Sequence, residues 1–135
     1  MEQIASWERR PFRRLVRLWL TTVLVVAAIV HWLAPEVFLP SMPPAIPSHE
    51  FFVAFTGLLE LLAAIGLWVP RLRRLTGICL SLYFVAILPA HFHVAMNDIP
   101  MFGLRNPWLW IRIPFQAVFI AAAWILREAD DVATG

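Results

Sequence analysis

Four long apolar runs alternate with short polar or proline-rich segments along the chain. Each run is close to the ~20 residues that a helix needs to cross a hydrocarbon core about 30 Å thick. The third run contains Pro89, which is expected to bend a helix at that point. The pattern predicts an all-α membrane protein whose four transmembrane helices form one bundle. These helices are expected at residues 18–34, 50–69, 75–96 and 108–126.

The segments outside the runs give the domain organisation. We expect a basic segment at residues 1–17, a four-helix transmembrane domain at 18–127 and a short tail at 128–135. A basic start before an apolar run is also typical of a signal peptide, but no small-x-small cleavage pattern follows the first run, so we expect an uncleaved helix. The segment between the first two runs cannot be helical throughout, because it contains five prolines. These are Pro35, Pro40, Pro43, Pro44 and Pro47.

The basic residues are distributed unevenly between the two ends of the runs. All eleven are arginines: five lie in segment 1–17, three lie in segment 71–74, and Arg127 follows the fourth run. Only Arg105 lies in a loop at the other end, and Arg112 falls within the fourth run. Cytoplasmic loops of membrane proteins are enriched in basic residues. The distribution therefore predicts that both termini are cytoplasmic (N-in/C-in) and that loops 35–50 and 97–107 lie outside.

The composition favours lipid as the main partner of the chain. Hydrophobic residues make up 61% and charged residues 15%, whereas about 25% of the residues in a soluble domain are charged. The expected location is the cell membrane, as a multi-pass protein of a bacterial inner membrane. A nucleic-acid partner is not expected, because the arginines flank apolar runs instead of forming a phosphate-binding face.

Several polar side chains fall at membrane depth, where they are costly unless they face the interior of the bundle. At 3.6 residues per turn, Glu60 shares a face with Thr56, Gly57, Ala63 and Ala64, which are small enough to let helices approach closely. His93 shares a face with Ala86, Ala90 and Asn97, and Gln116 shares a face with Trp108, Arg112 and Ala123. The candidate binding residues are Glu60, His93, Arg112, Gln116, His31, His91 and Asn97. We expect Glu60, His93, Arg112 and Gln116 to meet in one pocket open toward the outer face, with Arg112 as a partner of Glu60.

Two interpretations of this polar group stay open. It either fixes the packing of the helices or forms a site for a polar head group such as that of a quinone. No metal site is expected, because His91 and His93 point about 160° apart on a straight helix and no firmer zinc spacing occurs nearby. No residue is assigned a catalytic role, since no catalytic constellation is visible. Cys79, the single cysteine, is expected to serve packing.

Three motifs resemble those of the DoxX-like family of small membrane proteins. The second run and its following turn read FTGLLELLAAIGLWVPRLRRLTG at 55–77, with a central glutamate and a final basic cluster. The third run ends LPAHFHVAMND at 88–98, and the fourth reads LWIRIPFQAVFIAAAW at 109–124. The resemblance covers about residues 15–127.

This resemblance implies a four-helix bundle that works with an oxidoreductase. The family is named for a subunit of an archaeal thiosulfate:quinone oxidoreductase, so the implied role is an accessory or quinone-contacting membrane subunit. No covalently bound cofactor is expected, and any electron-transfer cofactor would belong to the partner subunit. The alternatives are a non-catalytic scaffold or stress-related protein, and a homo-oligomeric transporter or channel in which Glu60 relays ions or protons.

Overall fold

The computed structural model describes the backbone of residues 2–128 and the side chains of residues 10–128. This part of the chain forms five α-helices and three short 3₁₀ helices and contains no β-strand. The α-helices are α1 (Glu2–Leu33), α2 (His49–Gly66), α3 (Arg73–Ala86), α4 (Leu88–Met96) and α5 (Arg112–Leu126). The 3₁₀ helices are η1 (Pro35–Val37), η2 (Leu39–Ser41) and η3 (Trp108–Ile111).

Four helical stretches of the described chain are long and apolar enough to cross a membrane. They are Arg10–Leu33, His49–Gly66, Arg73–Met96 and Trp108–Leu126, each with a mean hydropathy of 1.4 or more. The predicted all-helical architecture with four membrane-length helices is therefore confirmed. The bounds differ at α1, which begins at Glu2, so that most of the basic segment 1–17 is helical. Its five arginines and Leu15 are good helix formers, which explains the extension.

The third membrane-length stretch is divided into α3 and α4 instead of forming one bent helix. The break falls at Ile87, two residues before Pro89, which occupies the first turn of α4. A proline there removes no hydrogen bond from the new helix, but it cannot continue the hydrogen-bond ladder of the preceding one. The buried positions of this stretch follow one helical stripe across the break, through Leu80, Phe84 and Val94, and it is not the face that was predicted to point inward. Ala86 and Asn97 are exposed, whereas Val94 and Ala95 are buried.

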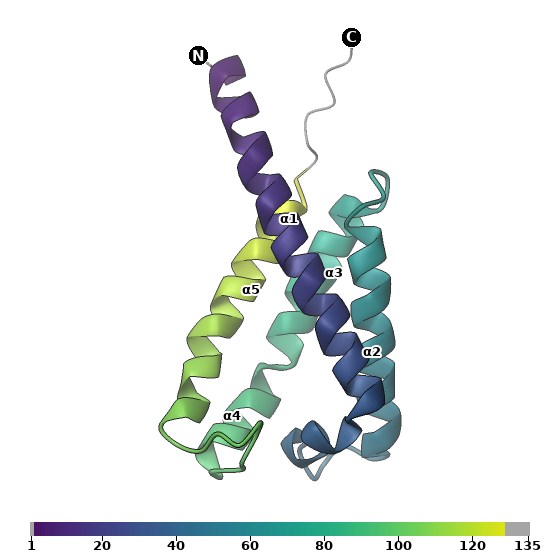
Figure 1. The fold of residues 1–135 in the computed structure, drawn as a ribbon, viewed down its shortest axis with the longest axis vertical. Helices are drawn as coiled ribbons and strands as arrows, with labels where there is room; N and C mark the ends of the chain where they lie inside the picture. The colour runs from purple at the N-terminus through teal and green to yellow at the C-terminus, as the bar shows by residue number, and fades with distance from the viewer. Residues whose placement is uncertain (1, 129–135) are drawn as a thin grey trace.

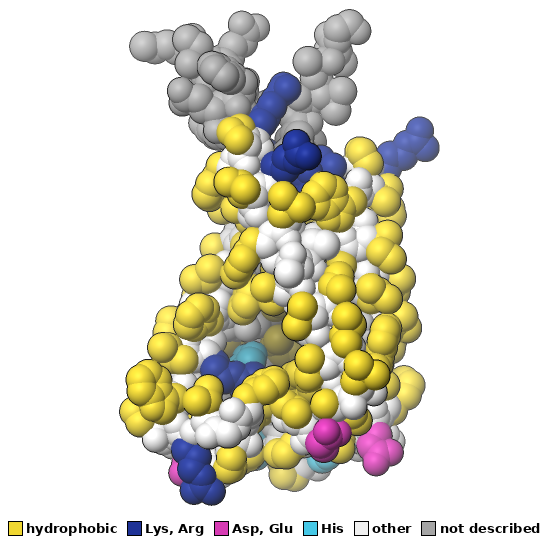
Figure 2. Space-filling model, in the orientation of Figure 1, with side chains coloured by type: hydrophobic (Ala, Val, Ile, Leu, Met, Phe, Trp, Pro, Cys, Tyr) yellow, Lys and Arg dark blue, Asp and Glu magenta, His cyan; other side chains and the backbone are white. Residues whose placement is uncertain are grey.

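The helices pack mainly in two pairs, α1 with α2 and α3 with α5. Figure 1 shows the start of α1, the turn between α2 and α3, and the end of α5 at one end of the bundle. The segments 34–48 and 97–107 lie at the other end. Basic side chains gather at the first of these ends in Figure 2. The uneven distribution of arginine in the sequence thus becomes a difference between the two ends of the molecule.

The core is narrow, and most of the helix surface is apolar. One buried cluster lies toward the arginine-rich end and includes Leu20, Leu24, Leu67 and Phe84. The second lies at the opposite end and consists of Val94, Ala95, Met101 and Leu109. Large apolar side chains are exposed along the middle of the helices, where Figure 2 shows a nearly continuous apolar surface. Such a surface is suited to lipid and would be an aggregation site in water.

Close packing of α3 against α5 depends on Gly77. A methyl group at this position would lie 2.7 Å from the backbone N and Cα of Arg127 and 2.9 Å from the carbonyl O of Ala123. Because these are backbone atoms, the two helices would have to separate to admit a side chain. Small residues at helix crossings are the usual device for close approach in membranes.

We expect Gly77→Ala to destabilise the bundle by about 1–2 kcal/mol, because overpacking costs roughly 1–3 kcal/mol and the gain in helix propensity is at most about 1 kcal/mol. The measurement is thermal unfolding of the purified protein in detergent. Ala121→Val, which adds methyl groups to an exposed position of α5, is the control and should change the midpoint little. A Gly77→Ala midpoint at or above that of the wild type would show that α3 and α5 do not pack this closely.

Candidate functional site

Glu60 is the most deeply placed acidic side chain among the described residues. It lies in the middle of α2 and is 6% exposed, on the same face as the buried Gly57 and Ala64. The prediction that Glu60 faces the bundle interior is therefore confirmed. The small residues above and below it let the neighbouring helix approach, so that its carboxylate is covered by protein.

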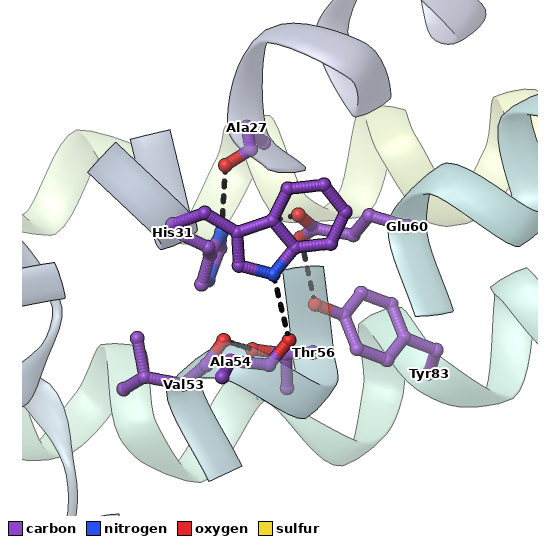
Figure 3. A network of polar contacts seen from close by, with 8 residues as sticks. Ala27, His31, Val53, Ala54, Thr56, Glu60 and Tyr83 are labelled. Atoms are coloured by element: carbon purple, nitrogen blue, oxygen red, sulfur yellow. Dashed lines mark hydrogen bonds and ion pairs between the residues drawn. The ribbon is translucent and has the colours of Figure 1, made fainter. Parts of the chain in front are cut away.

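The carboxylate of Glu60 joins three helices (Figure 3). The hydroxyl of Tyr83, from α3, donates a hydrogen bond of 2.8 Å to Oε1. Nδ1 of His31, from α1, lies 3.1 Å from Oε2 and 2.7 Å from the carbonyl O of Ala27. A single ring N–H cannot point well at both acceptors, and Oε2 receives no hydrogen bond of good geometry from the described residues. His31 therefore faces Glu60 as a charge partner while its N–H points at Ala27.

His31 is held in place by its surroundings. Its ring stacks on Phe38, with centroids 3.8 Å apart and an interplanar angle of 3°. A methyl group at Gly57 would lie 2.9 Å from Cβ of His31 and 3.0 Å from Nε1 of Trp32, so glycine is needed for α1 to reach this position. Nε1 of Trp32 donates a hydrogen bond of 3.1 Å to the carbonyl O of Ala54 on α2. The imidazole is thus fixed against the carboxylate by packing on both sides.

An apolar cleft of about 250 Å³ leads to this group between α2 and α3. Glu60 and Tyr83 line its polar end, and Thr76 is the other polar side chain in its wall. The remaining lining is apolar apart from the cysteine, and consists of Leu59, Leu62, Ala63, Leu75, Cys79 and Leu80. Several of these side chains are exposed on the outer surface of the bundle, so the cleft opens sideways. Cys79, which was expected to serve packing, is exposed in the wall of this cleft.

Arg112, Gln116 and His91 form a second polar group. Nε2 of Gln116 donates a 2.8 Å hydrogen bond to the carbonyl O of Phe84, and Nη1 of Arg112 donates one of 3.1 Å to Sδ of Met101. The side chain of His91 interacts with both Arg112 and Gln116. The predicted partnership of Glu60 with Arg112 is wrong, since the contacts of Glu60 are with other residues.

One pocket shared by the four predicted residues is therefore not formed. Tyr83 and Phe84 are adjacent in α3 and point about 100° apart, and they separate the Glu60 group from the Gln116 group. His93 is half-buried, and its contact is with the exposed Asn97, whose Nδ2 donates 2.8 Å to the carbonyl O of His93. Gln116 and Ala123 are buried as predicted, but Trp108 is 60% exposed.

Tyr83 is the site residue that sequence reasoning missed. It is the only tyrosine of the chain, and it lies three residues before Ala86 on the face that was predicted for the third helix. Extending that face by one turn toward the N-terminus would have reached it. Within residues 10–128, no three His, Cys, Asp or Glu side chains lie close enough together to hold a metal ion.

The fold and its interior define the class of this protein: an all-helical bundle with four membrane-length helices and a buried Glu–His–Tyr group. The chain belongs to the family described as a domain of unknown function, DUF8561, whose model matches residues 20–127. The match includes both polar groups. No curated protein and no solved structure matches the chain.

We expect the Tyr83–Glu60 hydrogen bond to stabilise the bundle measurably. Removing one partner of a buried hydrogen bond costs about 1–3 kcal/mol, so Tyr83→Phe and Glu60→Gln should each lower the unfolding midpoint in detergent. Because the two residues touch, the double variant should depart from additivity by roughly 0.5–3 kcal/mol. The control pairs Glu60→Gln with Thr22→Val, an exposed position on α1, and should be additive. An additive result for Tyr83 and Glu60 would mean that the bond contributes nothing.

Proposed function

We propose that this chain is an integral membrane protein that binds the head group of a lipid-soluble quinone in the cleft between α2 and α3. One observation carries the proposal: a buried carboxylate, bonded to a tyrosine and facing a histidine, closes the end of an apolar cleft that opens toward lipid. Small amphipathic ligands typically bind in apolar pockets that carry a few polar groups at one end.

The polar end of the cleft suits both redox states of a quinone. The carbonyls of the oxidised form accept hydrogen bonds, and the hydroxyl of Tyr83, which lines the cleft, can donate to one of them by turning away from Oε1 of Glu60. The hydroxyls of the reduced form donate, and Oε1 of Glu60, the oxygen that Tyr83 releases when it turns, can accept from one of them. Nδ1 of His31 lies 3.1 Å from the buried Oε2 and helps to fix the carboxylate beside the cleft.

The size of the cleft suggests how such a ligand would lie. Its volume of about 250 Å³ is slightly below the ~300 Å³ at which sites for drug-sized ligands begin. It is therefore large enough for a head group and too small for a long isoprenoid tail. The tail would leave through the sideways opening, past Leu59 and Leu62, and continue among the lipid chains.

We assign electron transfer to a partner oxidoreductase, with this chain as its accessory subunit. Cys79 is the single cysteine, so the chain cannot form a redox-active disulfide on its own. The alternative to ligand binding is that this polar network only stabilises the bundle. The contacts of Glu60 with helices α1 and α3 favour it. Quinone binding and folding stability therefore have to be measured separately.

We further propose that the arginine-rich end faces the cytoplasm, in the inner membrane of a bacterium. Arg71 and Arg74 lie at the same end of the bundle as the start of α1, whereas Arg105 lies at the other. The positive-inside rule favours this orientation.

In a Cys79→Ser background, a membrane-impermeant thiol reagent added outside intact cells should label Ser41→Cys and leave Arg71→Cys unlabelled. Permeabilised cells, in which both should react, provide the control. Labelling of Arg71→Cys but not Ser41→Cys in intact cells would reverse the proposed orientation.

Quinone binding should protect Cys79, which lines the cleft, from alkylation by N-ethylmaleimide. The probe is a fully substituted benzoquinone with a short tail, so that it does not itself add to the thiol. We expect Glu60→Gln and Tyr83→Phe to raise the quinone concentration needed for half-protection by about tenfold, since each loses a hydrogen bond to the ligand. Leu62→Trp, which fills the cleft, should abolish protection.

The control is Val118→Cys in the Cys79→Ser background, which places a thiol on the exposed surface of α5. It should react at the same rate with and without quinone. If Glu60→Gln lowers the melting temperature but leaves the protection of Cys79 unchanged, the network is only structural and the binding proposal is rejected.

A further inference from the structure

Arg112 is a half-buried cation whose charge is not matched by a carboxylate in the described chain. It opens α5, and none of the ion pairs within residues 10–128 includes it. Its hydrogen bond goes to the sulfur of Met101, and a thioether is only a weak acceptor. Because a partly desolvated charge is costly without a good partner, this guanidinium is poised to take an anionic ligand.

The described side chains beside Arg112 carry no negative charge that would neutralise it. His91 interacts with Arg112 and with the amide of Gln116, which is 3% exposed and anchored to the carbonyl O of Phe84. Asp98 is occupied elsewhere, since it lies 3.9 Å from Arg105 and accepts from the backbone N of Asn106. Figure 2 shows a basic side chain and a histidine in a hollow near this end of the bundle.

Aromatic side chains indicate the depth of this group. Trp108 and Trp110, in η3 directly before Arg112, are 60% and 44% exposed. Phe92 packs edge-on against Trp110, with centroids 6.3 Å apart. Exposed tryptophans gather at the membrane–water interface, so the start of α5 lies at the level of the lipid head groups. The anion available in quantity at that level is phosphate.

We propose that Arg112, with His91 beside it, binds a phosphate group at the end of the bundle opposite the arginine-rich one. The guanidinium fork matches two phosphate oxygens. The phosphate belongs to a phospholipid head group or is free in solution, and the same side chains would hold either. The site is separate from the Glu60 cleft and does not depend on the quinone proposal.

The test measures lipid binding to the full-length protein in detergent by native mass spectrometry, together with thermal melting. The probes are phosphatidylglycerol, a diacylglycerol with the same acyl chains, and inorganic phosphate. We expect phosphatidylglycerol to bind and stabilise the wild type, diacylglycerol to do neither, and Arg112→Gln to bind phosphatidylglycerol at least about tenfold more weakly. Competition by inorganic phosphate would identify free phosphate as a ligand, and its absence would identify the lipid head group.

Arg105→Gln is the matched control, because it removes an exposed arginine from the same end of the molecule. It should bind phosphatidylglycerol as the wild type does. Equal losses in Arg105→Gln and Arg112→Gln, unchanged binding in Arg112→Gln, or equally tight binding of diacylglycerol would each overturn the proposal. If Arg112→Gln does not fold, Arg112→Lys replaces it: weaker binding than the wild type supports the site, and equal binding rejects it.

Discussion

A carboxylate inside an apolar bundle is stable only if donors reach it, because an unpartnered buried charge is more costly than any single packing contact. Glu60 meets this constraint with a hydrogen bond from Tyr83 on α3, and the imidazole of His31 on α1 faces its other oxygen at 3.1 Å. Those contacts set how closely three helices approach. Gly57 is then required on α2, since a side chain there would collide with His31 and Trp32. The position of one acidic group thus determines the geometry of half the bundle.

The same constraint explains why the molecule has a cleft. The helices pack mainly as α1 with α2 and α3 with α5, and the contact between α2 and α3 is completed by Tyr83 reaching across to Glu60. Apolar side chains line the space beside this bridge, and no packed layer closes it. In lipid an open apolar space costs little, because acyl chains or an amphipathic ligand can fill it. At the polar end, which is already assembled, only the Tyr83 hydroxyl has to turn when a head group arrives.

Two adjacent residues of α3 contact two polar groups with different chemistry. Tyr83, just before the break, serves the carboxylate, whereas Phe84 offers its carbonyl to Gln116 and so anchors the group around Arg112. The first group carries an acid and lies deep beside an apolar cleft. The second carries a cation and lies near exposed tryptophans. An acid at depth suits a neutral hydrogen-bonding ligand, and a cation at the interface suits an anion.

The apolar runs determined the helical class, the four membrane-length helices and the inward direction of Glu60, because periodicity and length are local properties of a sequence. The uneven placement of arginine likewise distinguished the two ends. Only the tertiary structure shows which polar side chains contact one another. Glu60 contacts His31 and Tyr83, whereas Arg112 donates its hydrogen bond to Met101. Helical phase gives a direction but no neighbour, and in the third run the inward stripe passes through Phe84 and Val94 instead of Ala86 and Asn97. Which faces meet depends on how the helices cross, and that is set by the packing of the whole bundle at once.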